Sequence, residues 1–410
     1  MKVLLVNKFH WMKGGSETYY FELGKLLEEH GHEVAYFSME NEKNIKTGNK
    51  EYFVKEIDMN SKDITKALNV IYSKENKKIM EKALDEFKPD IVHVNNFQRQ
   101  LTASIIDAVK ERNIPIIYTS HDLQSVCPAS AMLCQGKVCE KCLKSTKLYC
   151  IKNKCIKGSY LKSILSTIES IKYKKDKVYE KFALIISPSS FTGNKIKSGG
   201  VNTKIITIPN FVKSNVIGKH KVKDGDYIFY FGRLSIEKGI LNLLKAFAKQ
   251  KQGYLYIAGD GPEKNNIMQY IKENKLEKRV KLLGFLKHDQ IEEYIANCSF
   301  VVVPSICYEN CPYSIIETYA IGKPVVGAKI GGIPELIIEG ENGFLYKYDD
   351  IEELSKIIKD MYSNEKLRLN MGKKSLMLAK EKYSEEEFYK KIIDAYNNVV
   401  GEKNVNKSNE

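Results

Sequence analysis

The sequence has no apolar run long enough to cross a membrane. Its longest apolar stretches, such as residues 205–209 and 299–304, are as long as a β-strand, whereas a transmembrane helix needs roughly 20 residues. The first residues, MKVLLVNKFHWMKGG, contain a short apolar run without a small-residue cleavage site, so we expect no signal peptide. The sequence therefore predicts a cytoplasmic protein, with peripheral attachment to the inner face of the membrane as an alternative.

Compositional signs of disorder or of a fibrous repeat are also missing. Hydrophobic residues make up 43% of the chain and charged residues 28%, which are typical of globular proteins. A single hydrophobic core rarely serves a chain of 410 residues, so we expect two domains.

Positive charge is abundant and locally concentrated. The formal net charge is +14, and residues 137–181 contain 13 Lys against 4 acidic residues. Such a concentration favours an anionic partner, which would be a phosphate compound, a nucleic acid or an anionic membrane surface. Solubility of a lysine-rich chain is the alternative that composition leaves open.

Short apolar strands alternate with helical patterns along most of the chain. Strands that consist of continuous Val, Ile and Leu runs are typical of parallel sheets covered by helices on both faces. A polar stretch, residues 211–225, separates two such series and is interpreted as a linker. The sequence thus predicts an α/β protein with two doubly wound, Rossmann-like domains that face a cleft. The expected strands are residues 2–7, 32–38, 90–95, 114–120, 183–188 and 204–209, then 227–231, 254–258, 280–284, 300–304, 324–328 and 344–348.

Ligands of such folds bind at the carboxyl ends of the strands, so the residues directly after each strand are site candidates. Gly15 lies in KGGSE, where two glycines open the first helix and can aim backbone N–H groups at an anion. An ordinary tight turn would use the same residues. His121 follows the strand that ends at Ser120 and could bind a hydroxyl, act as acid or base, or simply be packed.

The second series carries a more informative set. Arg233 and Lys238 flank the turn in FGRLSIEKG, and a guanidinium and an ammonium beside a helix N-terminus favour a diphosphate. Gly261 lies in the GDGP turn, where backbone can approach a ligand closely. Phe285 and Leu286 follow the strand LLG, and free backbone groups there could face a nucleobase.

The stretch YENCPYSIIETY contains two carboxylates eight residues apart. Glu309 lies in the loop after a strand, and Glu317 lies about one turn into an otherwise apolar helix. A buried carboxylate is costly unless it is paired, and vicinal sugar hydroxyls are suitable partners. Phosphate oxygens could be received by the backbone that begins this helix, which comprises Asn310, Cys311, Pro312 and Tyr313.

In this order, these residues resemble the retaining glycosyltransferases of family 4, which have the two-domain GT-B fold. The likeness covers nearly the whole chain and rests on GGSE, TSHD, GRLSIEKG, GDGP, the two glutamates and GKPVVGAKIGGIPELIIEGENGFL. It implies an acceptor-side domain over residues 1–213 and a donor-binding domain over residues 214–383. It also implies that a last helix, residues 384–402, crosses back to the first domain.

The resemblance implies transfer of a sugar, with retention, from a UDP- or GDP-linked donor to a glycan or lipid-linked saccharide of a cell-surface polysaccharide. Arg233 and Lys238 would then hold the donor diphosphate, and no metal would be needed for catalysis. Glu309 would contact the donor sugar and Glu317 the ribose, while Gly15 and His121 would face the transferred sugar. We take His121 and Glu309 as the catalytic candidates. Many members have EPFG where this chain has ENCP, so the sugar stays open. A sugar-nucleotide epimerase or a phosphorylase of the same fold is the rival hypothesis.

Six of the nine cysteines lie between residues 127 and 155, in a predicted insertion of the first domain. Cys139 and Cys142 form a C-x2-C half-site, and Cys150 and Cys155 could complete a structural zinc site. Free thiols and, less readily in a reducing compartment, disulfides are the alternatives. The segment has one aromatic residue, Tyr149, and no Arg, so we expect no nucleic-acid partner.

A basic amphipathic helix is predicted to follow the cysteines. It could dock on an anionic membrane surface, where lipid-linked sugars reside, or pack its apolar side against the core. The apolar positions at helical spacing are Leu161, Ile164, Leu165, Ile168 and Ile171, followed by Lys172, Lys174, Lys175 and Lys177.

Overall fold

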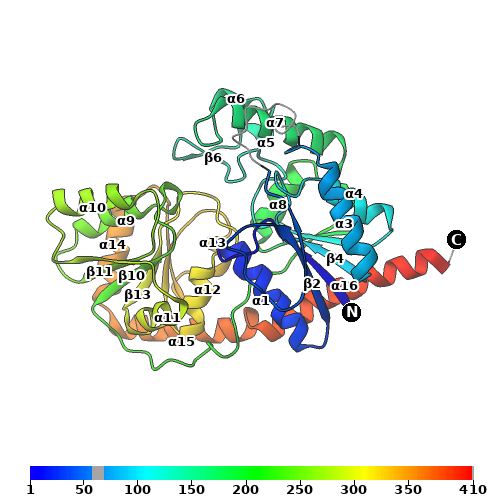
Figure 1. The fold of residues 1–410 in the computed structure, drawn as a ribbon. Coiled ribbons are helices and arrows are strands. Elements are labelled where there is room, and N and C mark those ends of the chain that lie inside the picture. The colour runs from blue at the N-terminus through cyan, green and yellow to red at the C-terminus, as the bar shows by residue number, and fades with distance from the viewer. Residues whose placement is uncertain (58–68, 409–410) are drawn as a thin grey trace. The chain divides into compact units, whose positions relative to one another are not determined.

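The structure is a computed structural model that describes residues 1–57 and 69–408, with side chains described as far as residue 402. It divides into two compact units (Figure 1). The first comprises Met1–Cys134, Cys139–Ile208 and Tyr389–Glu410, and the second comprises Gln135–Val138 and Pro209–Phe388. Within the described ranges, no helix is both long and apolar enough to span a membrane.

The first unit is built on a seven-stranded sheet in the order β3-β2-β1-β4-β5-β8-β9. Each neighbouring pair is parallel. Short apolar runs such as KVLLV and LIIS are buried on both faces, which is why they form central strands. The strands are β1 (Lys2–Val6), β2 (Glu33–Met39), β3 (Lys50–Val54), β4 (Ile91–Val94), β5 (Ile116–Thr119), β8 (Leu184–Ser187) and β9 (Ile205–Thr207).

Helices of the first unit follow the strands in the doubly wound manner. Between β5 and the next long helix, the cysteine segment forms only short elements. The helices are α1 (Gly15–Glu29), α3 (Lys74–Phe87), α4 (Ser104–Glu111), α7 (Tyr160–Lys175) and α8 (Ser190–Ser198). The short elements are β6 (Leu133–Cys134), α5 (Lys141–Lys144) and α6 (Tyr149–Lys152), together with β7 (Lys137–Val138), which is grouped with the second unit.

The second unit has a six-stranded parallel sheet in the order β12-β11-β10-β13-β14-β15. Its strands are β10 (Tyr227–Phe231), β11 (Tyr254–Ala258), β12 (Val280–Gly284), β13 (Phe300–Val303), β14 (Val325–Ala328) and β15 (Gly343–Tyr346). Its helices are α9 (Ile240–Ala248), α10 (Lys264–Glu273), α11 (His288–Asn297), α12 (Tyr313–Ile321), α13 (Ile333–Leu336), α14 (Ile351–Tyr362) and α15 (Glu365–Lys382).

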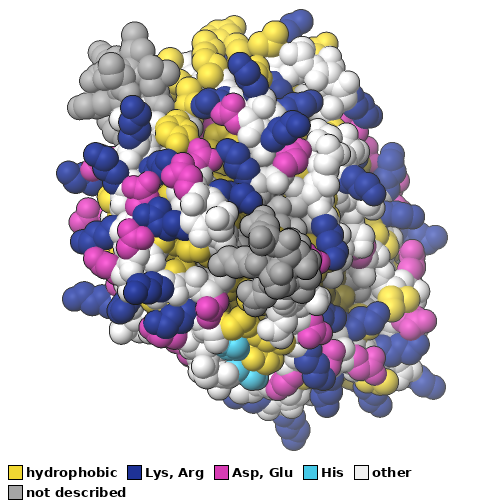
Figure 2. Space-filling model, turned by 90° about the vertical axis from the view of Figure 1, so that its right-hand side faces the viewer, with side chains coloured by type: hydrophobic (Ala, Val, Ile, Leu, Met, Phe, Trp, Pro, Cys, Tyr) yellow, Lys and Arg dark blue, Asp and Glu magenta, His cyan; other side chains and the backbone are white. Residues whose placement is uncertain are grey.

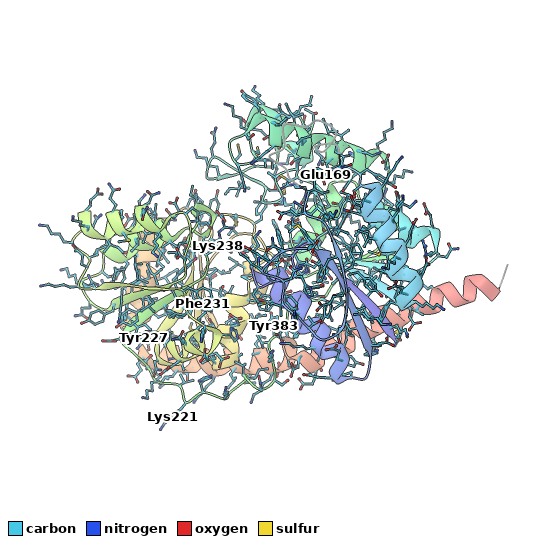
Figure 3. The ribbon with its side chains drawn as sticks, viewed as in Figure 1. Glu169, Lys221, Tyr227, Phe231, Lys238 and Tyr383 are labelled. Atoms are coloured by element: carbon cyan, nitrogen blue, oxygen red, sulfur yellow. The ribbon has the colours of Figure 1, made fainter. Side chains whose placement is uncertain are left out.

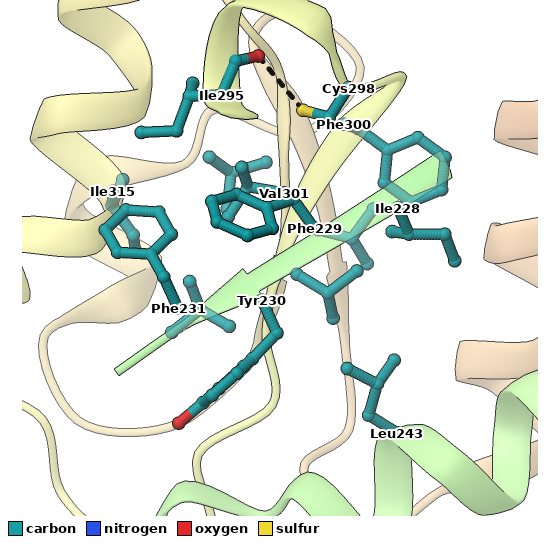
Figure 4. Close-up of a cluster of buried hydrophobic side chains, with 14 of the residues drawn as sticks. Ile228, Phe229, Tyr230, Phe231, Leu243, Ile295, Cys298, Phe300, Val301 and Ile315 are labelled. Carbon is teal, nitrogen blue, oxygen red and sulfur yellow. Dashed lines mark hydrogen bonds between the residues drawn. The ribbon is translucent and has the colours of Figure 1, made fainter. Parts of the chain in front are cut away.

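The core of this second unit is centred on β10, whose five residues are all buried (Figure 4). Phe229 packs between neighbouring strands and helices, and Cys298 is a small core residue whose Sγ donates to the Ile295 carbonyl at 3.2 Å. Cys307 and Cys311 are buried as well.

The last helix, α16 (Glu385–Ser408), contributes to both units. Near its start, the Val212 N–H donates to the Tyr383 carbonyl, so the stretch predicted as a linker is part of the second unit. Further along, Tyr389 stacks on His30 at 3.6 Å between ring centroids, and the Tyr396 hydroxyl lies 2.6 Å from His93 Nδ1. The helix continues beyond the predicted end at residue 402, as far as Ser408.

Candidate functional site

Three loops at the carboxyl edge of the second sheet hold one another through main-chain atoms. The Gly232 N–H donates to the Ala258 carbonyl at 3.1 Å, and the Gly259 N–H donates to the Gly284 carbonyl at 2.7 Å. A Cβ on Gly259 would lie 1.9 Å from the Gly232 oxygen. The predicted Gly261 belongs to the same contact, since its Cβ would lie 2.2 Å from the Leu234 oxygen. These glycines therefore allow the GRL, GDGP and LGF loops to touch.

The predicted residues Lys238 and Glu309 form an ion pair beside these loops. Lys238 Nζ donates to Glu309 Oε1 at 2.6 Å, and Ser305 Oγ donates to the same oxygen at 2.6 Å. Only 12% of the Glu309 side chain is exposed. Burial raises its pKa, but the Lys238 ammonium and the two hydrogen bonds outweigh burial and hold the pKa below its usual value. Glu309 is thus a buried carboxylate that stays ionised.

Main-chain contacts bring these two residues together from separate motifs. Lys238 ends a short turn after β10 (Figure 3), and the Ile306 N–H donates to the Glu237 carbonyl of that turn at 2.9 Å. On the other side, the Gly332 N–H donates to the Glu309 carbonyl at 2.7 Å. Gly331 has φ +61°, and a Cβ there would lie 2.4 Å from the Glu309 oxygen. The GG pair after β14 therefore supports the backbone of Glu309.

The guanidinium of Arg233 is accessible to a ligand. Its side chain is exposed, and no described residue makes a hydrogen bond or ion pair with the guanidinium, while its carbonyl accepts from the Tyr230 hydroxyl at 3.0 Å. The five N–H donors of the fork are therefore available to phosphate oxygens. Phe285, at the end of β12, is 80% exposed, which leaves its ring and the backbone beside Leu286 accessible.

The second predicted carboxylate, Glu317, has a partner that sequence reasoning missed. His288 Nδ1 lies 4.0 Å from Glu317 Oε1. Burial raises the pKa of Glu317, His288 opposes this shift, and the nearby Glu292 adds to it. His288 begins α11, directly after the LGFLK loop, and this position at a helix start was the available signal.

The loop ENCP leads into α12, which begins at Tyr313 with Pro312 as its N-cap residue. Asn210 Nδ2 donates to the Cys311 carbonyl at 2.7 Å and fixes this loop. Burial raises the pKa of the Cys311 thiol to about 12, which disfavours the reactive thiolate form. The backbone of Asn310 lies in the same loop, as predicted.

In the first unit, Gly15 is the first residue of α1, and Gly14 precedes it in extended backbone. The buried Glu17 lies in the first turn. Its Oε1 accepts from Asn7 Nδ2 at 3.2 Å and from Ser16 Oγ at 2.9 Å. Burial raises the pKa of Glu17. The first turn of α1 is therefore anchored to the residue that follows β1.

His121 follows β5 and is held as a neutral ring. Its Nε2 lies 2.8 Å from Asn95 Oδ1, so this nitrogen carries the proton and Nδ1 is left as an acceptor. The Tyr19 ring packs edge-on at 4.9 Å. Burial lowers the pKa of His121 to about 3. This geometry favours a hydrogen-bonding role over the acid–base role that the sequence left open.

Two known protein families match this chain, and their matches together cover most of it. The description "Glycosyltransferase Family 4" matches residues 13–215, and "Glycosyl transferases group 1" matches residues 213–376. The chain belongs to glycosyltransferase family 4.

Curated relatives of this glycosyltransferase include an uncharacterized glycosyltransferase of Methanocaldococcus jannaschii, 29% identical, and the N-acetyl-alpha-D-glucosaminyl L-malate synthase of Bacillus anthracis, 27% identical. Each match covers 48% of this chain and 54% of the relative, so the chain spans about half the length of these proteins. A 42.6 kDa protein in the cps region of Klebsiella pneumoniae is 26% identical over 87% of this chain and 92% of its own length.

Solved structures confirm the predicted GT-B fold class. Sucrose-phosphate synthase from Thermosynechococcus elongatus has a TM-score of 0.74 and 18% identity, covering 98% of this chain and 99% of that one. Anabaena HepE in complex with UDP has a TM-score of 0.70 and 19% identity, covering 96% and 99%.

The cysteine segment of this glycosyltransferase surrounds one small cavity. The cavity measures about 10 Å³, and burial raises the pKa of Cys142, which lines it, to about 11. Every described cysteine is a free thiol, and the described residues contain no group of three or more His, Cys, Asp or Glu arranged to hold a metal. Zinc therefore stays a prediction. The cavity is lined by the four predicted ligands Cys139, Cys142, Cys150 and Cys155, and by Cys127.

Elemental analysis tests this zinc prediction. If the cysteines bind zinc, reduced and desalted protein is expected to carry about one equivalent, because four thiolates satisfy tetrahedral Zn²⁺. The variant Cys139→Ser/Cys142→Ser should lose the metal, whereas Cys298→Ala, in the core of the second unit, should keep it. Less than about a tenth of an equivalent in the unmodified protein would contradict the prediction.

Proposed function

We propose that this family 4 glycosyltransferase moves a sugar, with retention, from a UDP- or GDP-linked donor to a glycan or lipid-linked saccharide of a cell-surface polysaccharide. The observation that carries the proposal is the partly buried Lys238–Glu309 ion pair, in which Lys238 belongs to the same loop after β10 as the exposed Arg233. A diphosphate and a sugar hydroxyl are the ligands that this combination of charges suits.

Charge complementarity assigns a role to each group in the proposed reaction. Lys238 has three N–H donors, and only one is used by Glu309, so the others can hold the donor diphosphate together with Arg233. Both cations stabilise the negative charge that develops on the leaving diphosphate, and no step requires a metal ion. Glu317 would accept from the ribose hydroxyls, and the backbone at the start of α12 would face the phosphates.

The ionised state of Glu309 also bears on the stereochemistry. A carboxylate with a lowered pKa, tied to an ammonium and a hydroxyl, is a weak base and nucleophile. We therefore propose that Glu309 orients the sugar hydroxyls, and that the leaving phosphate accepts the proton of the acceptor hydroxyl on the same face. His121 and Gly15 are proposed contacts of the transferred sugar, with neutral His121 acting through hydrogen bonds.

Relatives support this proposal. HepE binds UDP, and the Klebsiella protein is encoded in a cps region. A further relative is a lipopolysaccharide core biosynthesis glycosyltransferase of Rhizobium meliloti, 26% identical over 51% of this chain. These descriptions favour a nucleotide-sugar donor and a polysaccharide acceptor.

Labelled UDP-, GDP- and ADP-sugars test the proposed reaction directly. We expect transfer from a UDP- or GDP-sugar, with retention seen by NMR of the product. Arg233→Ala should lower kcat/KM about 100-fold or more, which is about 2.7 kcal/mol of lost charge stabilisation. Lys272→Ala, at an exposed cation in the last turn of α10, is the matched control. Epimerisation of a sugar nucleotide without transfer to any acceptor would overturn the proposal in favour of an epimerase.

A further inference from the structure

Helix α7 turns its polar side inward and its apolar side outward. Ser163, Ser166 and Glu169 are at most 3% exposed. Of the five predicted apolar positions, only Leu165 is buried, so the alternative of a core-packed apolar side is wrong. The other four recur every three or four residues and form one stripe, here called the α7 stripe. Its members and their exposed fractions are Leu161 (55%), Ile164 (37%), Ile168 (44%) and Ile171 (46%).

Hydrogen bonds on the inward side fix this orientation. Glu169 Oε1 accepts from the Arg99 N–H at 2.8 Å, and Ser163 Oγ accepts from the Ile156 N–H at 3.1 Å. The Tyr173 hydroxyl accepts from the Ala103 N–H at 3.0 Å. Turning α7 over would leave these buried polar groups unpaired, so the fold itself holds the α7 stripe in solvent. Glu169 is labelled on its helix in Figure 3.

An exposed apolar stripe with a basic flank is typical of helices that lie in a membrane interface. Lys162, Lys172, Lys174 and Lys175 lie on the same helix, within the most basic part of the chain. Figure 2 shows apolar side chains gathered at the upper edge of the drawn face, with Lys and Arg side chains close by. Near an anionic lipid surface, the electrostatic attraction of lysine adds to the free energy that is gained by burying the apolar side chains.

A cationic cavity lies at the N-terminal end of the same helix. It measures about 660 Å³, and Glu56 is the one acidic side chain among the described residues that line it. Arg99 has φ +71°, a rare backbone for this residue. Its Nη2 donates to the Pro128 carbonyl at 2.7 Å, and its buried Nε lies 3.9 Å from Glu169 Oε2 but makes no hydrogen bond to a described residue. The cationic side chains that line the cavity are Lys8, Lys13, Arg99, Lys157 and Lys162.

The crowding of cations in this cavity is costly without an anion. Burial, and next the charge of Arg99, lower the pKa of Lys8 to about 8, although Asp122 and Glu169 act in the opposite direction. A bound anion would offset the repulsion and supply acceptors for the Lys8 ammonium and Arg99 Nε.

We propose that the α7 stripe docks on an anionic bilayer and that the cavity beside it takes the phosphate groups of a lipid-linked acceptor. The proposal rests on the proposed function, because it names the acceptor class of that same transfer. The shared residue Lys162, on α7 and in the cavity, links the two surfaces. Lipid chains would stay in the bilayer while the phosphates enter the cavity.

Vesicle co-sedimentation tests the docking surface without any need for transfer. The protein is expected to bind vesicles of phosphatidylcholine with phosphatidylglycerol about tenfold or more tightly than phosphatidylcholine alone, and less tightly at high salt. Leu161→Glu/Ile168→Glu should weaken binding about tenfold or more. Leu369→Glu/Met377→Glu, at positions on α15 that are 41% and 58% exposed, is the matched control. All variants are checked by circular dichroism and thermal melting.

Equal binding of the two double variants, or no binding of the unmodified protein, would overturn the docking surface. A concentration-dependent dimer that Leu161→Glu/Ile168→Glu abolishes would assign the α7 stripe to a second copy of the chain and also overturn it.

Farnesyl diphosphate probes the cavity. Its binding is measured with saturating UDP, so that the proposed diphosphate site of the second unit is occupied. Lys157→Gln/Lys162→Gln should weaken farnesyl diphosphate about tenfold while UDP affinity stays unchanged, and Lys174→Gln/Lys175→Gln should alter neither. The cavity assignment would be overturned if the Lys157 and Lys162 substitutions leave the affinity for farnesyl diphosphate unchanged. It would also be overturned if farnesol, which lacks the diphosphate, binds equally tightly. If UDP does not bind, GDP takes its place in this measurement, and failure to bind either nucleotide would instead contradict the proposed function.

Discussion

Replacing Glu309 or Lys238 by Ala is expected to lower kcat/KM for sugar transfer about 100-fold or more, equivalent to about 2.7 kcal/mol. Each substitution removes one half of the partly buried ion pair, in which Nζ and Oε1 are 2.6 Å apart. Without Lys238, the developing diphosphate charge loses a fixed cation. Without Glu309, the sugar hydroxyls lose their acceptor and Lys238 loses its orientation.

Steady-state kinetics of the single and double variants measure the effect. Because the two residues act as a unit, the double variant should lose less than the product of the single losses. The exposed ion pair of Lys249 and Glu352, in the same unit, provides the control, and Lys249→Ala/Glu352→Ala should keep activity. Thermal melting separates catalytic loss from misfolding, since a buried charge without its partner also destabilises. Near-normal turnover of the Glu309, Lys238 and Arg233 variants would refute the site.

Acidification from pH 6.5 to pH 5 is expected to cost about 2 kcal/mol of unfolding free energy through each of His93 and His121. His93 is fully buried between the Tyr396 hydroxyl (2.6 Å) and Thr119 Oγ1 (2.7 Å). Burial lowers the pKa of both histidines to about 3, against an ordinary value near 6.5. Their stabilising contribution is complete above pH 6.5 and declines as the pH falls toward 3, because the unfolded chain takes up protons that the folded chain excludes.

Urea unfolding of the unmodified protein and of His93→Gln between pH 6.5 and 5 isolates this contribution. The unmodified protein should lose about 2 kcal/mol more than the variant over this range. Buried carboxylates with raised pKa, such as Glu17 and Asp122, oppose the histidines in both proteins and cancel in the comparison. His288→Gln, at a side chain that is 60% exposed, should show the same change of unfolding free energy with pH as the unmodified protein. If the unfolding free energy of His93→Gln changes with pH as much as that of the unmodified protein, His93 is not held neutral in the folded chain.

Most strands could be predicted from the sequence because buried parallel strands are continuous apolar runs. β10, β11 and β12 have the predicted bounds, and the other predicted strands differ by at most two residues at an end. β3 was missed, since KEYFV mixes polar residues into a partly exposed edge strand. The helical end of α16 was missed because its sequence, NVNKS, is polar and has low helix propensity.

Residues of the candidate site could be named from the sequence, but their contacts could not. Position after a strand identified Lys238 and Glu309 separately, although they are 71 residues apart and touch only in the fold. The hydrogen bond of Ser305 and the support from Gly331 depend on two further loops, and no local pattern encodes such contacts. In α7, spacing revealed an apolar side but not its direction, because direction depends on which side finds hydrogen-bond partners.

In the second unit, main-chain contacts at Gly232, Gly259 and Gly284 fix the positions of the loops, whereas the side chains at the loop tips decide what the loops contact. Backbone atoms set the spacing of these loops, so the scaffold is insensitive to the identity of side chains at the loop tips. Phe285, at one such tip, is solvent-facing, and its exchange disturbs no core contact. Surface exchanges at the loop tips can therefore change what these loops contact without disturbing the scaffold, whereas Gly259 cannot carry a side chain, because its Cβ would collide with the Gly232 oxygen.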